Sequence, residues 1–178
     1  MRRAVVIAEE SLEATLATVK IGVSEEEIAG ELFLQLLRHG SETTLPFSPI
    51  VAGGPNGANP HSRPSARKLK KGDLLIIDWG ACYKGYVSDL TRTFGVGEVD
   101  EQAAAVYHAV RQANAAGRVA GRPGAACGEV DMAARQCVEA AGYGQFFPHR
   151  TGHGIGMKNA AYKVLVDDDG KILGAHVI

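Results

Sequence analysis

Two aspartates on either side of a predicted hairpin turn, Asp78 and Asp89, are the residues whose spacing points most clearly to chemistry. A turn centred between Tyr83 and Lys84 places them opposite each other on antiparallel strands, where Cβ atoms lie about 4.5–5.5 Å apart. Two carboxylates at that separation repel each other, and aspartate is a poor strand former. The pair therefore indicates a bound metal ion or a dyad that shares a proton. The alternative is that one aspartate only caps a turn.

Two histidines could add nitrogen ligands to this pair. His153 stands in the run Thr151–Gly156, whose glycines leave the imidazole unobstructed. His61 follows Asn59 and Pro60 in a predicted loop, where functional groups are often held. Either histidine alone is more often structural than functional. Together, two carboxylates and imidazoles favour Mn, Co, Zn or Fe over Mg or Ca.

Helices with recognisable start signals precede the hairpin. Apolar residues at helical spacing predict a first helix over residues 4–20. Ser24 and Glu27 have the spacing of a capping box, which predicts the start of a second helix. An apolar strand over 72–78 and a partner strand over 87–94 supply the hairpin that carries the two aspartates.

The second part of the sequence predicts two more helices and a final strand pair. The helices cover residues 100–119 and 129–141 and are separated by glycines. The strands cover 163–166 and 171–175, joined by the turn-forming Asp168–Gly170. Paired helices with antiparallel strands predict the α+β class. A length of 178 residues predicts a single domain, 1–178.

Composition argues against several classes of partner. Nineteen basic and twenty acidic residues leave no field suited to nucleic acid or to an anionic membrane. No apolar stretch approaches the length of a membrane span, and the N-terminal apolar run is too short for a signal peptide. Three cysteines without a CxxC pattern predict free thiols. We therefore expect a cytoplasmic protein.

Longer motifs around these residues carry a family resemblance. They are Ile77–Ala81, Gly85–Phe94 and His149–Gly156. These motifs resemble signatures of the M24 metallopeptidase family, in its Xaa-Pro aminopeptidase and prolidase branch. The resemblance covers residues 1–157 and implies the pita-bread (creatinase/aminopeptidase) fold, in which paired helices lie on a curved antiparallel sheet. It also implies hydrolysis of short Xaa-Pro peptides by a water molecule that bridges two metal ions.

The resemblance also implies roles for single residues. Family members bind their metals with two aspartates, one histidine and two glutamates, and Asp78, Asp89 and His153 match the first three. His61 matches a histidine that contacts the substrate. No glutamate follows Glu139, so the two glutamate ligands have no counterpart. We therefore expect a truncated pita-bread fold with impaired metal-dependent hydrolysis. The alternative is a non-catalytic scaffold or a peptide-binding module.

The last residues resemble a different family. Residues 162–178 resemble a strand pair from the dimerisation domain of pyridine-nucleotide-disulfide oxidoreductases. This implies a chimera in which 1–157 is a pita-bread portion and 158–178 is a C-terminal hairpin of different origin. Such a hairpin could complete the sheet, cover its open edge, and support a homodimer. No glycine-rich dinucleotide fingerprint accompanies it, so we expect no nucleotide cofactor.

Overall fold

The computed structural model describes residues 1–157 and the backbone of two short strands at 165–166 and 172–174. Contacts divide the chain into two compact units. One unit contains Met1–Asp100 with the segment at Gly156, and the other contains Glu101–Ile155. Helices occur together with antiparallel strands, which confirms the predicted α+β class. A single domain over residues 1–178 stays a prediction.

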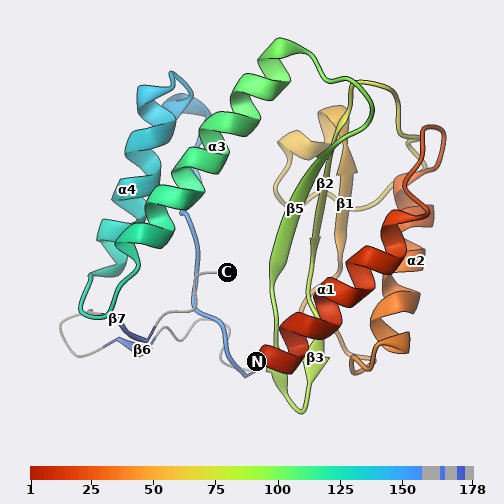
Figure 1. Ribbon diagram of the computed structural model, residues 1–178, viewed down its shortest axis with the longest axis horizontal. Coiled ribbons are helices and arrows are strands. Elements are labelled where there is room, and N and C mark those ends of the chain that lie inside the picture. The colour runs from red at the N-terminus through yellow and green to blue at the C-terminus, as the bar shows by residue number, and fades with distance from the viewer. Residues whose placement is uncertain (158–164, 167–171, 175–178) are drawn as a thin grey trace. The chain divides into compact units, whose positions relative to one another are not determined.

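Two amphipathic helices, α1 (Arg2–Leu16) and α2 (Glu25–Arg38), cover one face of the sheet in the first unit (Figure 1). α1 is shorter than predicted at its C-terminus, because the N–H groups of Thr18 and Val19 bond to carbonyls only three residues earlier, at 2.9 and 3.1 Å, and so end the α-helical pattern. α2 starts at the predicted capping box. Ser24 Oγ accepts the Glu27 N–H at 3.3 Å, and the Glu27 carboxylate accepts the Ser24 N–H at 2.8 Å. The capping interaction lowers the pKa of Glu27, chiefly through the backbone N–H of Ser24.

Three antiparallel strands form the sheet of the first unit, in the order β1-β2-β5. They are β1 (Ile50–Gly53), β2 (Leu74–Trp79) and β5 (Leu90–Gly95). β2 and β5 are the two predicted strands with shifted ends, whereas β1 was not predicted. A short 3-10 helix, η1 (Gly54–Ala58), follows β1 directly. The sheet therefore has β2, which ends in Asp78 and Trp79, as its central strand.

Alternation along β2 sets which side chains enter the core. Leu75, Ile77 and Trp79 are fully buried and pack with apolar residues of α1 and α2. Ile76 and Asp78 are only partly buried, and alternation directs them to the other face of the sheet. Asp78 therefore lies on the face that these helices do not cover.

The hairpin between β2 and β5 narrows into the short strands β3 (Cys82–Tyr83) and β4 (Tyr86–Val87). Lys84 and Gly85 form the turn, with φ of 49° and 77°. Positive φ at both central residues is the requirement of a type I′ turn, which matches the twist of hairpin strands. The predicted turn centre was one residue too early.

That shift changes the pairing of the two aspartates. Asp78 pairs with Thr91, not with Asp89. The prediction that Asp78 and Asp89 are directly opposed is therefore wrong. Asp89 precedes Thr91 by two positions, and side chains alternate with period two along a strand. In a regular ladder, both aspartate side chains therefore lie on the same face of the sheet.

The second unit is a helical hairpin. α3 (Glu101–Ala120) and α4 (Cys127–Ala140) lie side by side, close to their predicted ranges (Figure 1). Its small core contains Ala113, Ala134 and Val138. Small side chains at the contact allow the two helices to pack closely.

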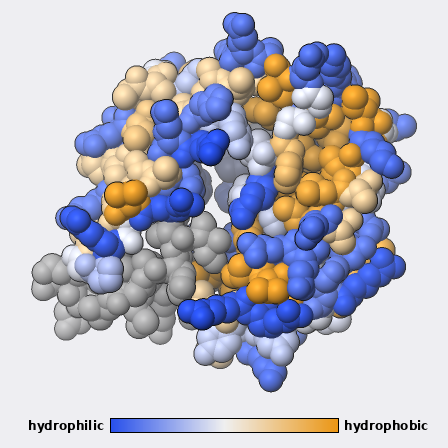
Figure 2. Space-filling view, in the orientation of Figure 1, coloured by the Kyte–Doolittle hydropathy of each residue, from blue (hydrophilic) through white to orange (hydrophobic). Residues whose placement is uncertain are grey.

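The remaining sequence predictions concern the tail, the thiols and the surface. Strands β6 (Leu165–Val166) and β7 (Ile172–Gly174) pair antiparallel, which confirms the predicted strand pair; the rest of 158–178 lies outside the described residues. All three cysteines are free thiols, as predicted. Polar and charged residues cover much of the visible surface, with apolar patches between them (Figure 2). Within the described part of the chain, no helix is long and apolar enough to cross a bilayer.

Candidate metal and substrate site

Asp78 lies near the end of the central strand. Its neighbours across the sheet are Ile50 on β1 and Thr91 on β5. The side chain is partly buried, and its Oδ1 atom is shielded from solvent. A carboxylate oxygen in such a place favours interaction with a cation or with a hydrogen-bond donor, because an ionised group loses solvation on burial.

Asp89 lies just before β5, where the two long strands come close together. Ser88 donates its backbone N–H to the Ala81 carbonyl at 2.9 Å. A Cβ on Gly80 would collide with the carbonyl oxygen of Ser88, so this approach requires glycine at that position. Asp89 lies outside the paired residues, which begin at Leu90, and it precedes Thr91, the partner of Asp78, by two positions. In a regular ladder, residues related in this way are about 7–8 Å apart. Long-range pairing thus brings the two carboxylates to one end of the sheet.

Two buried side chains next to the aspartates tie this end of the sheet to α1. Trp79 donates its indole N–H to the Ala8 carbonyl at 2.9 Å. Ser88 donates its hydroxyl to the Ala4 carbonyl at 3.0 Å and accepts the Ala81 N–H at 2.9 Å. Both side chains are fully buried on the helical side. Because neighbouring side chains alternate, these hydrogen bonds orient Asp78 and Asp89 toward the face of the sheet that α1 does not cover.

His61 lies in the same unit, in the exposed loop that follows η1. Its backbone N–H donates to Asn59 Oδ1 at 3.0 Å, a local side-chain bond that fixes the turn. Sequence reasoning missed the buried residue that anchors this loop, Glu25. An acidic residue in the first turn of a helix is normally solvent-exposed, so no local signal indicates its burial.

His153 lies in the second unit, and its side chain is exposed. The segment that leads to it is fixed by two residues of α4. Asp131 accepts the backbone N–H of Thr151 at 2.7 Å and its hydroxyl at 2.8 Å. Arg135 donates to the carbonyl oxygens of Phe147 and His149 at 2.8 and 2.9 Å. The bonds from Thr151, followed by the ion pair with Arg135, hold the pKa of Asp131 below its usual value.

The donors fit a divalent cation in part. Two aspartates on one side of the sheet end supply oxygen ligands, and an imidazole would suit the transition metals. Among the described residues, however, no group of three or more His, Cys, Asp or Glu side chains could hold a metal ion. Asp78 and Asp89 share one unit, whereas His153 belongs to the other. The described residues therefore provide a partial donor set.

Comparison with known proteins gives a consistent picture. A model of metallopeptidase family M24 matches residues 1–175. The uncharacterized peptidase YqhT of Bacillus subtilis is 38% identical over 158 residues, which are 89% of this chain and 44% of that protein. A dipeptidase from Pyrococcus horikoshii has a TM-score of 0.87 at 41% identity and covers 99% of this chain and 49% of its own.

An Xaa-Pro dipeptidase from Bacillus anthracis has a TM-score of 0.82 at 40% identity and covers 86% of this chain and 43% of its own. These matches confirm the predicted pita-bread fold. The chain spans about half the length of the curated relatives it matches, between 44% and 50%. The family match runs through residue 175, beyond the boundary predicted at 157. A separate origin of residues 158–178 stays a prediction.

Proposed function

Since this chain belongs to metallopeptidase family M24, we propose that it is a portion of a metal-dependent peptidase that hydrolyses short Xaa-Pro peptides. The observation that carries the proposal is the pair of aspartates at one end of the sheet. Trp79 and Ser88 are bonded to α1 on the opposite side, so the carboxylates are held by rigid, buried neighbours. A preorganised carboxylate pair is what a metal-dependent hydrolase requires.

In this proposal Asp78, Asp89 and His153 are metal ligands, and the ion is Mn, Co, Zn or Fe. When bound, the metal would lower the pKa of a water molecule and polarise the scissile carbonyl. His61 would contact the peptide. Relatives whose names specify a substrate support this class, because they include an Xaa-Pro dipeptidase and a prolidase.

We expect metal binding and turnover to be weak in this chain by itself. No glutamate follows Glu139, so the two glutamate ligands implied by the family resemblance have no counterpart. Losses around a metal site commonly lower affinity or activity 10- to 100-fold, as an order of magnitude. A homodimer through the tail hairpin is a further part of the proposal, based on the resemblance of residues 162–178.

A second candidate function is peptide binding without hydrolysis. It is favoured by the incomplete donor set, since no group of three metal-binding side chains occurs within the described residues. In that case the first unit would be a scaffold that presents His61 and its loop to a peptide. Such a protein would bind Xaa-Pro peptides equally well with and without metal.

Hydrolysis of a dipeptide such as Ala-Pro, measured after loading with Mn or Co, tests the proposal. We expect slow, chelator-sensitive turnover that Asp89→Asn abolishes. The control is Glu98→Gln, because the Glu98 side chain is 88% exposed and forms a surface ion pair with Lys71. Turnover that survives both chelator and Asp89→Asn would rule out the metal-dependent mechanism. Peptide binding with no turnover at all would support the second function.

A further inference from the structure

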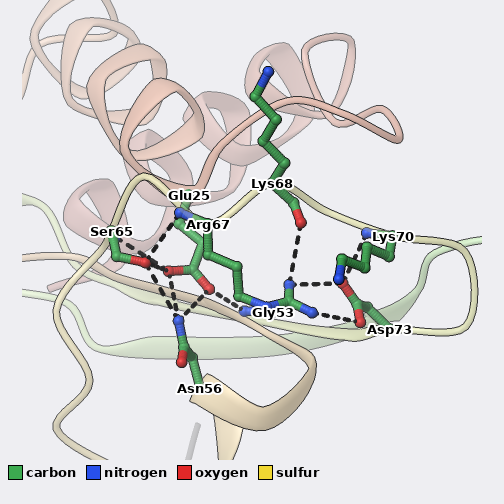
Figure 3. Close-up of polar contacts among 8 residues, drawn as sticks. All are labelled: Glu25, Gly53, Asn56, Ser65, Arg67, Lys68, Lys70 and Asp73. Atoms are coloured by element: carbon green, nitrogen blue, oxygen red, sulfur yellow. Dashed lines mark hydrogen bonds and ion pairs between the residues drawn. The ribbon is translucent and has the colours of Figure 1, made fainter.

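A buried glutamate of α2 holds the loop that carries His61. Glu25 is 0% exposed, although it is the first residue of its helix. Burying an ionised carboxylate is unfavourable unless several donors compensate the lost solvation. Three residues supply these donors, and all three belong to the segment that runs from the last residue of β1 to the residues before β2 (Figure 3). They are Gly53, Asn56 and Ser65.

The contacts fix both ends of the loop. At the first end, Glu25 accepts the Gly53 N–H at 2.7 Å and the Asn56 amide at 3.0 Å. At the second end it accepts the Ser65 N–H at 3.1 Å and the Ser65 hydroxyl at 2.7 Å. One carboxylate thus brings together residues that lie on opposite sides of His61 in the sequence. The macrodipole of α2 adds to this, because its positive end favours an anion at the first helical position.

A chain of hydrogen bonds leads from Glu25 to His61. Asn56, held by Glu25, accepts the Asn59 N–H with its carbonyl at 3.2 Å. Asn59 in turn accepts the His61 N–H with its side-chain oxygen at 3.0 Å. Every bond in this chain lies within the first unit. The backbone position of His61 therefore depends on a residue buried beneath the loop.

The neighbouring ion pair does not replace this role. Arg67 donates to both carboxylate oxygens of Asp73, at 2.7 and 2.9 Å, which fixes the segment after Ser65 (Figure 3). The backbone N–H of Arg67 also donates to Ser65 Oγ at 3.2 Å. The ion pair thus anchors the entry to β2 and packs against Gly53 and Gly54, whereas Glu25 forms hydrogen bonds to the loop at both of its ends.

We infer that Glu25 is a positioning residue, which fixes the loop of residues 53–65 and thereby sets where His61 meets a bound peptide. The inference rests on the proposed function, because it takes His61 as a residue that contacts the substrate. The competing explanation is that Glu25 only stabilises the start of α2.

A matched pair of variants separates these explanations. Glu25→Gln removes the charge and replaces one of the two acceptor oxygens that serve the loop. Glu27→Gln changes a first-turn glutamate of the same helix, whose carboxylate hydrogen-bonds to Ser24. In metal-free protein, NMR order parameters of the His61 and Ser62 amides should fall below about 0.6 in Glu25→Gln and stay near about 0.85 in Glu27→Gln. Unchanged order in Glu25→Gln would overturn the inference.

A milder variant covers the case in which Glu25→Gln does not fold. Asn59→Ala removes the acceptor of the His61 N–H at an exposed position, so it should leave the thermal midpoint within about 2 °C of wild type. The order parameter of the His61 amide should still fall. A rigid His61 in Asn59→Ala would show that the hydrogen-bond chain does not hold it.

A double-mutant cycle on peptide hydrolysis tests the link to the substrate. Glu25→Gln should lower kcat/KM about tenfold in the wild-type background and have little further effect in His61→Ala. An equal loss in both backgrounds would mean that Glu25 acts through overall stability, which contradicts the inference. If the chain hydrolyses no peptide, the proposed function fails, and the NMR measurement alone decides whether Glu25 fixes the loop.

Discussion

Replacing Ser88 by alanine removes the hydroxyl that ties the site end of the sheet to α1. Three backbone groups lose a contact, of which the Ala81 carbonyl, 3.5 Å from the hydroxyl, keeps its bond from the Ser88 N–H. The Ala81 N–H loses its acceptor, and Ala81 is fully buried, so an unsatisfied donor remains at a cost of about 1–3 kcal/mol. The Ala4 carbonyl loses a second donor but, as part of a helix, keeps its intrahelical bond. We therefore expect a loss of about 2 kcal/mol in the free energy of unfolding.

Ser11→Ala is the matched control. Ser11 is also a fully buried serine, but its hydroxyl only donates to the Ile7 carbonyl, four residues earlier in the same helix, at 2.6 Å. Its removal leaves no donor without an acceptor, so the free energy of unfolding should change by less than about 0.5 kcal/mol. Both variants replace a fully buried serine by alanine. They differ in that only Ser88→Ala leaves a buried backbone N–H without its acceptor.

Urea unfolding followed by tryptophan fluorescence measures the difference. Trp79 is the only tryptophan in the sequence and lies in the first unit, so its emission reports that unit. With a slope of about 2 kcal/mol per molar urea, the midpoint should fall by about 1 M in Ser88→Ala and hardly move in Ser11→Ala. Equal midpoints for the two variants would refute the argument that the Ser88 hydroxyl secures this end of the sheet.

Three further predictions concern other contacts. Hydrogen bonds from Arg67 hold the pKa of Asp73 below its ordinary value. The stabilisation that Asp73 contributes to the folded state is therefore present above its unfolded-state pKa and is lost as pH falls through its folded-state pKa. Asp73→Asn should lower the free energy of unfolding by about 2 kcal/mol at neutral pH. In urea unfolding at acidic pH, the free energy of unfolding of this variant should fall less steeply with pH than that of the wild type. Asp131→Asn weakens two charge-assisted bonds, so the Thr151 amide should exchange hydrogen about fivefold faster by NMR. Gly80→Ala should shift the strands apart and lower the thermal midpoint by at least about 4 °C in calorimetry.

Local signals in the sequence predicted most helices correctly. The start of α2 was predicted because a capping box lies within four consecutive residues, Ser24 to Glu27. The predicted end of the fourth helix at residue 141 lies close to the observed end of α4, and the next residue, Gly142, adopts a positive φ of 83° as a helix-terminating glycine does. In both cases the decisive interaction joins neighbours in the chain.

Predictions that depended on tertiary contacts were less accurate. β1 has only four residues before a glycine-rich segment, and it becomes a strand through pairing with β2. The hairpin register was wrong because Lys84 takes a positive φ of 49°, which is uncommon for lysine and is not indicated by its side chain. Glu25 was missed because its donors lie 28 to 40 positions away in the chain.

The candidate site was also predicted only as far as local sequence signals reach. Asp78 and Asp89 were selected from their spacing, and long-range pairing brings them to one end of the sheet, although not as opposed partners. The residues that hold them, Trp79 and Ser88, bond to carbonyl groups of α1 more than seventy positions away. Such ties depend on how a helix packs on a sheet, so the sequence alone did not reveal them.

Calorimetric titration of the metal-stripped chain with Mn and Co tests the central claim most directly. The account predicts saturable binding that weakens at least about tenfold in both Asp78→Asn and Asp89→Asn and is unchanged in Glu98→Gln. Binding that is absent in the wild type, or equally strong in all four proteins, would contradict the claim that the two aspartates hold a metal ion.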